Sequence, residues 1–422
     1  MLNQAGEVRE ERVAGQPCMD GELVASDLVR RLPSVFPDQT NEEVLTLLTS
    51  FPDVIGLPVI EQGRPIGLIN RSIFLNEMAK PFRREVYSRK SCIAFMDKQP
   101  LVVDGRMGIQ ELSFRVVDAG NKALKDGFII TDPSGEYVGM GTGEDLMQTI
   151  SHLQAEKSRM VMESINYASV IQKSFLRSAR RDMEESLSDY FIHWEPRDKV
   201  GGDYYFCKKF DDGFFIALID CTGHGVPGAF MTLIMAAFLD HLLQNENRKD
   251  PAGALSAINR KVKIALGQIE EENISHLADS EHSDDGMDTA FCWVSPESRK
   301  MVYAGAKMPI FILTPDAEEV VLHEGDRKGV GYVETPSHFA WTNREIDLPP
   351  GAQVHLTTDG IIDQIGGARS IAFGKKRFAK LLLEHRNLPM NEQKQRIMDA
   401  FYAYQGGQKR RDDVSLLGFR IQ

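Results

Sequence analysis

Several features that define other classes of protein are scarce or missing in this chain. Its 422 residues include five cysteines, an odd number, with no CxxC pair, so we expect neither a disulfide framework nor a cysteine zinc site. Basic residues are outnumbered by acidic ones, 49 against 61, which gives a net charge of −12. That balance argues against non-specific binding to nucleic acid or to an anionic membrane surface. No run of about 18 apolar residues appears, so no membrane-spanning helix is expected.

The start of the chain also lacks a targeting pattern. The segment MLNQAGEVREERVAGQ is polar and acidic and does not resemble a secretory signal. We therefore expect residues 1–16 to be a disordered tail of a cytoplasmic protein with reduced thiols. The length of the chain predicts two or three domains.

Residues 17–150 contain a pattern that occurs twice. Segments 54–75 and 126–147 each read as an apolar strand, a turn, a second strand beginning near a glycine, and a helix. A helical stretch precedes each of them, at 42–50 and at 109–123. The period is near 70 residues, longer than that of typical solenoid repeats, so we interpret this region as a paired α/β module.

Residues 151–187 contain neither glycine nor proline and predict a helix of about 35 residues, roughly 50 Å long at 1.5 Å per residue. The apolar residues at helical spacing are Met160, Met162, Ile165, Ala168, Ile171, Phe175 and Leu176. Such a helix suggests a dimerising connector between two domains, and hence a homodimer. Packing of its C-terminal half on the following domain is an alternative, and both can hold together.

The remaining residues, 188–422, are rich in strand patterns. The candidate strands are FFIALID, TAFCWV, MVYAGA, IFILTP, QVHLTTD and VSLLGFRI, and the candidate helices are residues 228–243, 251–266, 376–385 and 391–404. Strands and helices in this proportion predict a two-layered sheet flanked by helices.

Five aspartates lie where these strands end and turns begin: Asp203, Asp220, Asp359, Asp412 and Asp413, in VGGDYY, LIDCTGHGVPGAFM, LTTDGIID and RRDDVSLL. A carboxylate at a strand end is held rigidly and stays open to solvent. Several of them, brought together by a sheet, form an all-oxygen site suited to Mg²⁺ or Mn²⁺. One Asp-Gly pair is a common turn, but four such segments together predict a metal centre.

These segments resemble the SpoIIE-type members of the PPM family of metal-dependent serine/threonine phosphatases. The matching motifs, in order, are WEPRDKVGGDYY, IDCTGHGVPGAFM, MDTAFCWV, YAGAKMPIFIL, TTDGIIDQIGG and RRDDVSLLGFRI, and they extend over nearly all of 188–422. The resemblance implies a β-sandwich of two packed sheets with helices outside. It also implies a centre of two metal ions, Mn²⁺ or Mg²⁺, at one end.

By position, the resemblance implies that Asp220 bridges the two ions and that Cys221 supplies a backbone carbonyl. Asp203 would serve the first metal, directly or through water, and Asp359 and Asp412 the second. Asp413 would support these ligands from beside them. Asp288, in GMDTAF, is either a ligand of a further metal or an ordinary loop carboxylate.

The implied reaction is in-line attack on phosphoserine or phosphothreonine by a metal-activated water, without a phospho-enzyme. Arg197 is a candidate for holding phosphate, or else forms a surface ion pair. His224 is either a general acid or a residue that packs its glycine loop. Lys307 either faces the substrate or is a solvated lysine.

The paired module at 17–150 resembles a tandem CBS domain. CBS modules often end the second strand with G-x-x-T-x-x-D, whose threonine and aspartate face an adenine nucleotide, and the second repeat has this pattern as Gly139, Thr142 and Asp145. The first repeat has Asn70 and Ile73 instead, so we expect its site to be degenerate. Thr142 and Asp145 also suit a helix N-terminus, which leaves a purely structural pair as the alternative.

The predicted fold is thus α+β: a CBS-like α/β pair at 17–150, a connector helix at 151–187 and a PPM-type β-sandwich at 188–422. We expect a phosphatase controlled by the N-terminal module, with a metal site completed only when the helix near 165–180 docks in one register. The resemblance implies a phosphorylated STAS-domain protein as substrate. Two rival hypotheses are a phosphoprotein-binding pseudophosphatase and a two-metal nucleotide enzyme, although no Walker-type sequence is present.

Overall fold

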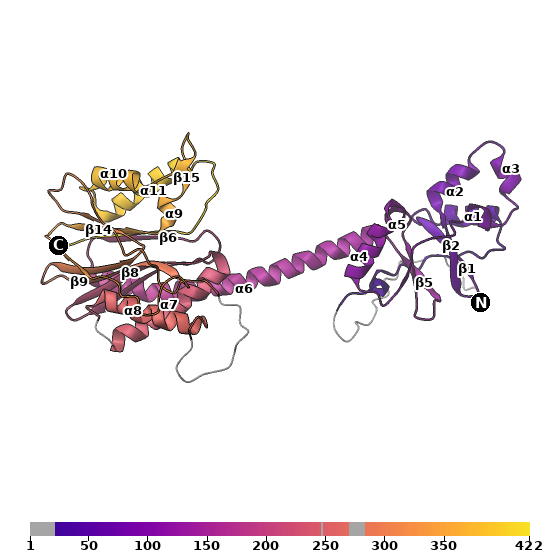
Figure 1. Ribbon diagram of the computed structural model, residues 1–422. Helices are drawn as coiled ribbons and strands as arrows, with labels where there is room; N and C mark the ends of the chain where they lie inside the picture. The colour runs from indigo at the N-terminus through magenta and orange to yellow at the C-terminus, as the bar shows by residue number, and fades with distance from the viewer. Residues whose placement is uncertain (1–21, 246–247, 270–282) are drawn as a thin grey trace. The chain divides into compact units, whose positions relative to one another are not determined.

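The computed structural model describes residues 22–245, 248–269 and 283–422 (Figure 1). The predicted disordered tail at 1–16 and Cys18 lie outside these ranges. The chain divides into two compact units, Met1–Met160 and Val161–Gln422.

The first unit contains the two sequence repeats. Its helices are η1 (Ala25–Leu28), α1 (Asn41–Ser50), α2 (Arg71–Met78), α3 (Arg83–Tyr87), η2 (Cys92–Phe95), α4 (Ile109–Asp118) and α5 (Asn121–Asp126). Its strands are β1 (Gly56–Glu61), β2 (Arg64–Asn70), β3 (Val102–Asp104), β4 (Phe128–Thr131) and β5 (Tyr137–Gly141). Each repeat thus ends in an antiparallel strand pair, β1–β2 in the first and β4–β5 in the second.

The two repeats also exchange pairing partners. In the first repeat β2 is bridged at Leu68 to Asp97, in the segment that leads into the second repeat. In the second repeat β5 is bridged at Met140 to Arg30, in the segment that leads into the first. The period near 70 residues is therefore visible in the backbone pairing as well as in the sequence.

One helix, α6, runs from Gly143 to Ser186, starting earlier than the sequence predicted. Its buried face in the second unit also differs from the predicted apolar stripe. The buried residues, spaced three and four apart, are Ser169, Gln172, Leu176, Ala179 and Met183, whereas Phe175 is exposed. This polar-containing stripe is the face that packs on the second unit, because spacing of three and four keeps side chains on one side of a helix.

The second unit is built around two antiparallel five-stranded sheets. The first has the order β13-β10-β9-β8-β7 and the second β12-β11-β14-β17-β6. The strands are β6 (Tyr190–Glu195), β7 (Asp203–Phe210), β8 (Gly213–Cys221), β9 (Met287–Ser295), β10 (Lys300–Ala306), β11 (Ile310–Leu313), β12 (Val321–His323), β13 (Arg344–Asp347), β14 (Gln353–Thr357) and β17 (Val414–Arg420). A two-stranded sheet, β15 (Ile365–Gly366) with β16 (Ile371–Ala372), lies apart from them.

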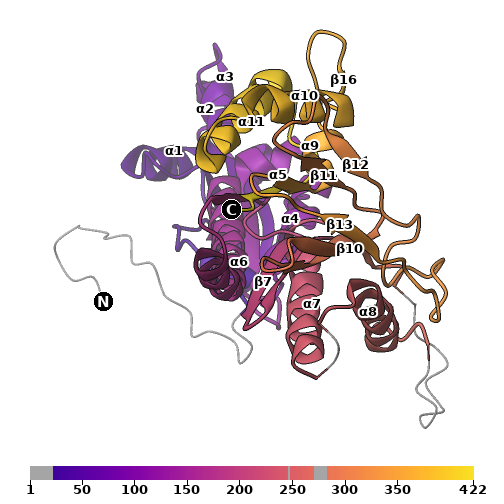
Figure 2. The ribbon, with the colours of Figure 1, turned by 90° about the vertical axis from the view of Figure 1, so that its left-hand side faces the viewer.

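The two large sheets pack face to face over one apolar core, in which Phe214 of β8 meets Phe419 of β17 with ring centroids 6.0 Å apart. The helices are α7 (Gly225–Asn245), α8 (Pro251–Ala265), α9 (Asp359–Ile362), α10 (Lys375–His385) and α11 (Met390–Gln405). Helices α7 and α8 cover the outer face of the first sheet, and α10 and α11 that of the second (Figures 1 and 2). The predicted sandwich flanked by helices is confirmed.

Helix α7 departs from one expectation of the sequence. By length and composition its segment Gly225–Gln244 could cross a membrane, the one such helix among the described residues. Half of that segment is buried against the first sheet and α8, as in the core helix of a globular domain.

Candidate active site

Three aspartates form a row across the first sheet. Asp203 begins β7 and pairs with Asp220 near the end of β8, which in turn pairs with Asp288 at the start of β9. Residues directly opposite each other on neighbouring strands point to the same face, with Cβ atoms about 5 Å apart. Backbone register alone therefore places the three carboxylates side by side.

The second sheet brings its aspartates to the same end of the sandwich. Asp359 follows β14 as the first residue of α9, and Asp412 and Asp413 precede β17. Thr358 connects the two sheets, because its Oγ1 donates to Asp203 Oδ2 at 2.8 Å and accepts from the Ser415 N–H at 3.1 Å. We did not predict a role for Thr358; its place directly before Asp359 in TTDG was the available signal.

Asp413 has a different environment from the other acids. Its buried carboxylate accepts hydrogen bonds from the main-chain N–H groups of Arg197 and Gly202, both at 2.6 Å. A Cβ on Gly201 would lie 2.5 Å from Asp413 Oδ2, so only glycine fits there. Asp413 therefore holds the VGGD turn that delivers Asp203.

The electrostatics of the site are dominated by carboxylates. Burial raises the pKa of Asp220 well above its ordinary value, and the charges of Asp203, Asp359, Asp412 and Asp288 raise it further. Burial likewise raises the pKa of Asp203. The charges of Asp413 and Asp412 raise it further, whereas hydrogen bonds from Ser415 and Thr358 lower it in part. The site thus gathers negative charge that a cation can neutralise.

Asp359 stands at the solvent edge of this group. Partial enclosure by the protein, and then the neighbouring Asp412, Asp363 and Asp288, raise its pKa to about 6 although its side chain still reaches solvent. Within residues 22–245, 248–269 and 283–422, no three histidine, cysteine or acidic side chains are already arranged as a metal ligand set. The aspartates interact electrostatically without converging on one point.

The donor chemistry nevertheless fits a divalent ion, because carboxylate oxygens with uncompensated charge are what Mg²⁺ and Mn²⁺ require. The backbone supports this. A Cβ on Gly202 would lie 2.7 Å from the carbonyl oxygen of Cys221 and 2.5 Å from that of Gly223, so the loop after β8 closes tightly on the turn before β7. The buried Cys221 thiol has a pKa raised well above normal by burial and then by Asp220, which does not suit a nucleophile.

Three further candidates occupy the rim. His224 Nδ1 lies 2.7 Å from Asp198 Oδ2, so the ring is oriented by a carboxylate. The Arg197 guanidinium donates to the Arg411 carbonyl oxygen at 2.8 Å. Lys307 Nζ lies 3.7 Å from Asp288 Oδ1, so it is not a solvated lysine without partners.

Helix α6 reaches the site through one buried side chain. Gln172 Nε2 donates to the Gly201 carbonyl oxygen at 2.7 Å and to Thr232 Oγ1 on α7 at 3.0 Å, and Gln172 Oε1 accepts from the Gly201 N–H at 3.3 Å. Helix α6 is therefore hydrogen-bonded to the turn before Asp203. We did not predict a role for Gln172; a glutamine in register with Leu176 and Ala179 was the available signal.

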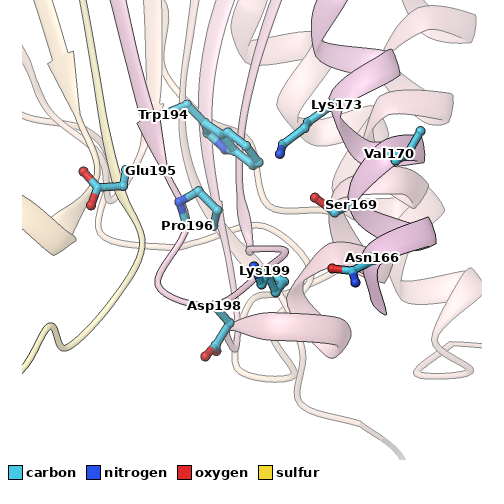
Figure 3. Close-up of a pocket in the computed structure, with 9 residues that line it drawn as sticks. All are labelled: Asn166, Ser169, Val170, Lys173, Trp194, Glu195, Pro196, Asp198 and Lys199. Carbon is cyan, nitrogen blue, oxygen red and sulfur yellow. The ribbon is translucent and has the colours of Figure 1, made fainter. Parts of the chain in front are cut away.

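A groove of about 590 Å³ lies beside this contact, between α6 and the segment after β6. Figure 3 shows Lys173 reaching from α6 toward Trp194, with the Glu195 carboxylate turned away from both. Glu195 accepts instead from Tyr402 and Arg410. The groove thus flanks the loop that leads to Asp203 and presents an ammonium group and an indole ring.

In the first unit, Thr142 and Asp145 form a helix cap. Thr142 Oγ1 donates to Asp145 Oδ2 at 2.7 Å and accepts from the Asp145 N–H at 3.1 Å, and Arg30 pairs with Asp145 at 2.7 Å. Asn70 occupies the matching place in the first repeat and caps α2 by accepting from the Ile73 N–H at 2.9 Å. Both positions therefore begin a helix, as the residue types favour.

A β-sandwich between paired helices, with aspartates gathered at one end of its strands, is the fold of PP2C-type metal-dependent protein phosphatases. The family model for stage II sporulation protein E (SpoIIE) matches residues 211–422, half of the chain, and the CBS domain model matches residues 24–80. The chain therefore belongs to the SpoIIE family, as a serine/threonine phosphatase with an N-terminal CBS domain.

One solved structure agrees with this assignment. The PP2C domain of SiaA from Pseudomonas aeruginosa is 34% identical, with a TM-score of 0.56, and the match covers 64% of this chain and 100% of that one. The PP2C phosphatase domain of SpoIIE from Bacillus subtilis, with a fragment of its regulatory domain, is 16% identical with a TM-score of 0.42 over 56% of this chain and 63% of that one. A TM-score this low adds nothing to the assignment. No curated protein is significantly similar to the chain.

Proposed function

We propose that the chain hydrolyses phosphoserine or phosphothreonine on a regulatory protein, at a centre of two divalent ions held by Asp203, Asp220, Asp359, Asp412 and the carbonyl of Cys221. The observation that carries this proposal is the pairing of Asp203 with Asp220 across the first sheet, together with the carboxylates of Asp359, Asp412 and Asp288 whose charges act on Asp220. When bound, Mn²⁺ or Mg²⁺ supplies an activated water and neutralises phosphoryl charge.

The protein's own groups do the remaining work. Thr358 and Asp413 position Asp203, one through a hydrogen bond to its carboxylate and the other through the turn before it. The Arg197 guanidinium donates to the Arg411 carbonyl oxygen at 2.8 Å, and the Arg411 charge acts on Asp359. Guanidinium groups suit phosphoryl oxygens, so these two arginines are the proposed phosphoryl ligands. The Asp198 contact keeps the His224 ring oriented.

The first test is release of phosphate from p-nitrophenyl phosphate by the full chain with Mn²⁺, with Mg²⁺ and with EDTA, alongside Asp220→Asn. We expect turnover that needs the metal and falls by at least about 10³-fold in the variant, since the charge at the centre changes without a change in shape. Turnover that survives the substitution would rule out the assigned centre. A chain that binds phosphoprotein without turnover would favour the pseudophosphatase hypothesis.

The proposed substrate is a phosphorylated STAS-domain protein, an implication of the family alone. Its test is dephosphorylation of such a protein, followed as the loss of its phosphorylated band. A phosphorylated but unfolded peptide from the same protein serves as the control, since a phosphatase that recognises the folded domain should act on it more slowly.

We propose that the N-terminal module controls this centre through α6, in a cytoplasmic homodimer. One support is Gln172, which ties α6 to the carbonyl and the N–H of Gly201 in the turn before Asp203. Another is the exposed Tyr167, Val170 and Phe175 on the same helix, which suit a helix–helix contact. Light scattering of the purified chain gives its oligomeric state, and replacing Val170 and Phe175 by serine should shift it toward monomer.

For the coupling itself, Gln172→Leu keeps the volume of the side chain and removes its hydrogen bonds. We expect Mn²⁺ affinity to fall about 10–100-fold, as for other groups that orient metal ligands, with little change in fold by circular dichroism. Ser174→Ala is the matched control, because its exposed hydroxyl bonds only within the helix, to the Ile171 carbonyl. Equal affinity in the two variants would contradict coupling through Gln172.

An adenine nucleotide at Thr142 and Asp145 is the proposed ligand of the CBS unit. Because Asp145 pairs with Arg30, a nucleotide must share or replace that contact. Calorimetric titration with ATP and AMP tests this, with Asp145→Ala as the control. Absence of binding to the unaltered chain would leave the cap as the only role of the motif.

A further inference from the structure

The row of aspartates in the first sheet is not uniform. The charges that act on Asp203 and Asp220 most strongly are other carboxylates. Asp288, the third member, has a cation beside it: Lys307 Nζ lies 3.7 Å from Asp288 Oδ1. This ammonium group stands at the outer end of the same row of carboxylates.

Lys307 is held from three sides. Besides Asp288, its Nζ lies 4.0 Å from Glu334 Oε1 and 4.2 Å from the centre of the Tyr332 ring. Two carboxylates and the face of an aromatic ring all attract a cation. The ammonium group thus has the kind of surroundings that a metal ion at Asp288 and Glu334 would have.

The backbone keeps Lys307 in this place. The residue has a φ of +57°, a conformation that costs a non-glycine residue energy and persists only where its surroundings enforce it. Its N–H donates to the Asp326 carbonyl oxygen at 2.8 Å, and it is bridged to Thr289, next to Asp288. Strand register therefore aims the side chain along the row.

The Asp288 carboxylate is enclosed from the opposite side. A Cβ on Gly329 would lie 2.6 Å from Asp288 Oδ1, so a glycine is needed there. Oδ1 is buried without a hydrogen bond of good geometry, and the side chains that act on the Asp288 carboxylate are those of Lys307 and Tyr332. An enclosed oxygen of this kind needs a charge nearby, and Lys307 is the cation that the structure supplies.

We propose that Lys307 is a built-in cation that occupies the place of an additional metal ion beside Asp288, so that the centre takes two divalent ions and not three. This inference rests on the proposed two-metal centre. Lys307 balances Asp288 and acts as a positioning residue through it, and it shares Glu334 with Lys328, whose Nζ lies 3.6 Å from Glu334 Oε2. Because its ammonium group already faces Asp288, it suits this role better than that of binding the phosphoryl group of the substrate.

The test is the number of Mn²⁺ ions bound per full-length chain, measured by equilibrium dialysis and by the loss of the free-Mn²⁺ signal in electron paramagnetic resonance. We expect about two ions for the unaltered chain. Lys307→Met keeps the length of the side chain and removes its charge, and it should bind about three. Lys307→Arg, which keeps the charge, and the double variant Lys307→Met/Asp288→Asn should both return to about two.

Each other result overturns the inference. A Lys307→Met chain that binds as many ions as the unaltered one shows that Asp288 does not take a metal when uncovered, and leaves the two-metal centre standing. If the Asp288→Asn variant, with Lys307 in place, binds one ion fewer than the unaltered chain, then Asp288 already holds a metal ion and Lys307 does not exclude it. This measurement does not depend on the folding of any Lys307 variant. Failure of the proposed centre looks different: Asp220→Asn would then bind as much Mn²⁺ as the unaltered chain.

Discussion

Selected acidic residues of the two units are in opposite surroundings. In the first unit Asp104 pairs with Arg106, whose hydrogen bonds lower the pKa of that carboxyl to about 2, and Asp145 pairs with Arg30. In the second unit the pKa of Asp220 is raised instead, by burial and then by the charges of four further carboxylates. The two acids of the first unit are thus matched by arginine, whereas the carboxylates around Asp220 leave negative charge for a ligand.

Asp145 and Asp359 make the comparison sharpest. Each follows a strand, lies in the first turn of the next helix and has a threonine shortly before it. Asp145 accepts a hydrogen bond from Arg30, 115 positions away in the sequence, whereas Asp359 is repelled by the charges of Asp412 and Asp288. The two aspartates thus have a similar place relative to strand and helix, and the charged residue that the tertiary structure brings near each one separates a helix cap from a candidate ligand.

The largest effect that separates the two units is expected from metal binding. Mn²⁺ should stabilise the second unit alone, by about 2.7 kcal/mol for each ion at a free concentration of about 100 Kd. All three tryptophans, Trp194, Trp293 and Trp341, belong to that unit, so fluorescence-detected unfolding follows it separately from circular dichroism. If Mn²⁺ stabilised the first unit, whose unfolding is seen by circular dichroism but not by tryptophan fluorescence, as much as the second, the comparison would be wrong.

A smaller effect is expected from pH. Burial lowers the pKa of His355, in β14, to about 4, so the ring is neutral in the folded state. As pH falls, the His355 ring is protonated in the unfolded chain at a higher pH than in the folded chain. The contribution of His355 to the free energy of unfolding is therefore fully present above about pH 6.5 and decreases as pH falls toward 4, by about 3 kcal/mol in total.

The variant His355→Gln should flatten this pH dependence in the second unit, as measured by urea unfolding followed by tryptophan fluorescence at pH 7, 6 and 5. The first unit has one histidine, the exposed His152, and no tryptophan, so its unfolding is followed by circular dichroism and serves as the internal reference. An unchanged slope of unfolding free energy against pH in the variant would mean that other groups cause the loss.

The smallest effect concerns the helix cap. Thr142→Ala removes the acceptor for the Asp145 N–H and should cost the first unit about 1 kcal/mol, with Mn²⁺-dependent turnover of p-nitrophenyl phosphate unchanged. Thr142→Ser keeps the hydroxyl and should lose little. A large fall in turnover for the alanine variant would show that the start of α6 is coupled to the second unit more tightly than a cap requires.

The sequence alone determined the sandwich and the acids that serve it. Apolar runs such as FFIALID bury on both faces and therefore predict strands, and the aspartates at their ends follow from the same pattern. Helices of the second unit were predicted to within a few residues at Pro251–Ala265 and Lys375–His385, because glycine, proline and polar residues mark their ends. The family resemblance supplied the reaction.

Only the tertiary structure decided which partners these residues have. The register between β8 and β9 places Asp288 beside Asp220. Lys307 lies beside Asp288 because of a turn that no local sequence pattern predicts. The same holds for Gln172, whose three hydrogen bonds end on backbone 29 positions away and on Thr232. Strand and helix periodicity is a local property that sequence records, whereas the charge that faces a carboxylate is set by contacts between distant segments, which exist only once the sheets have packed.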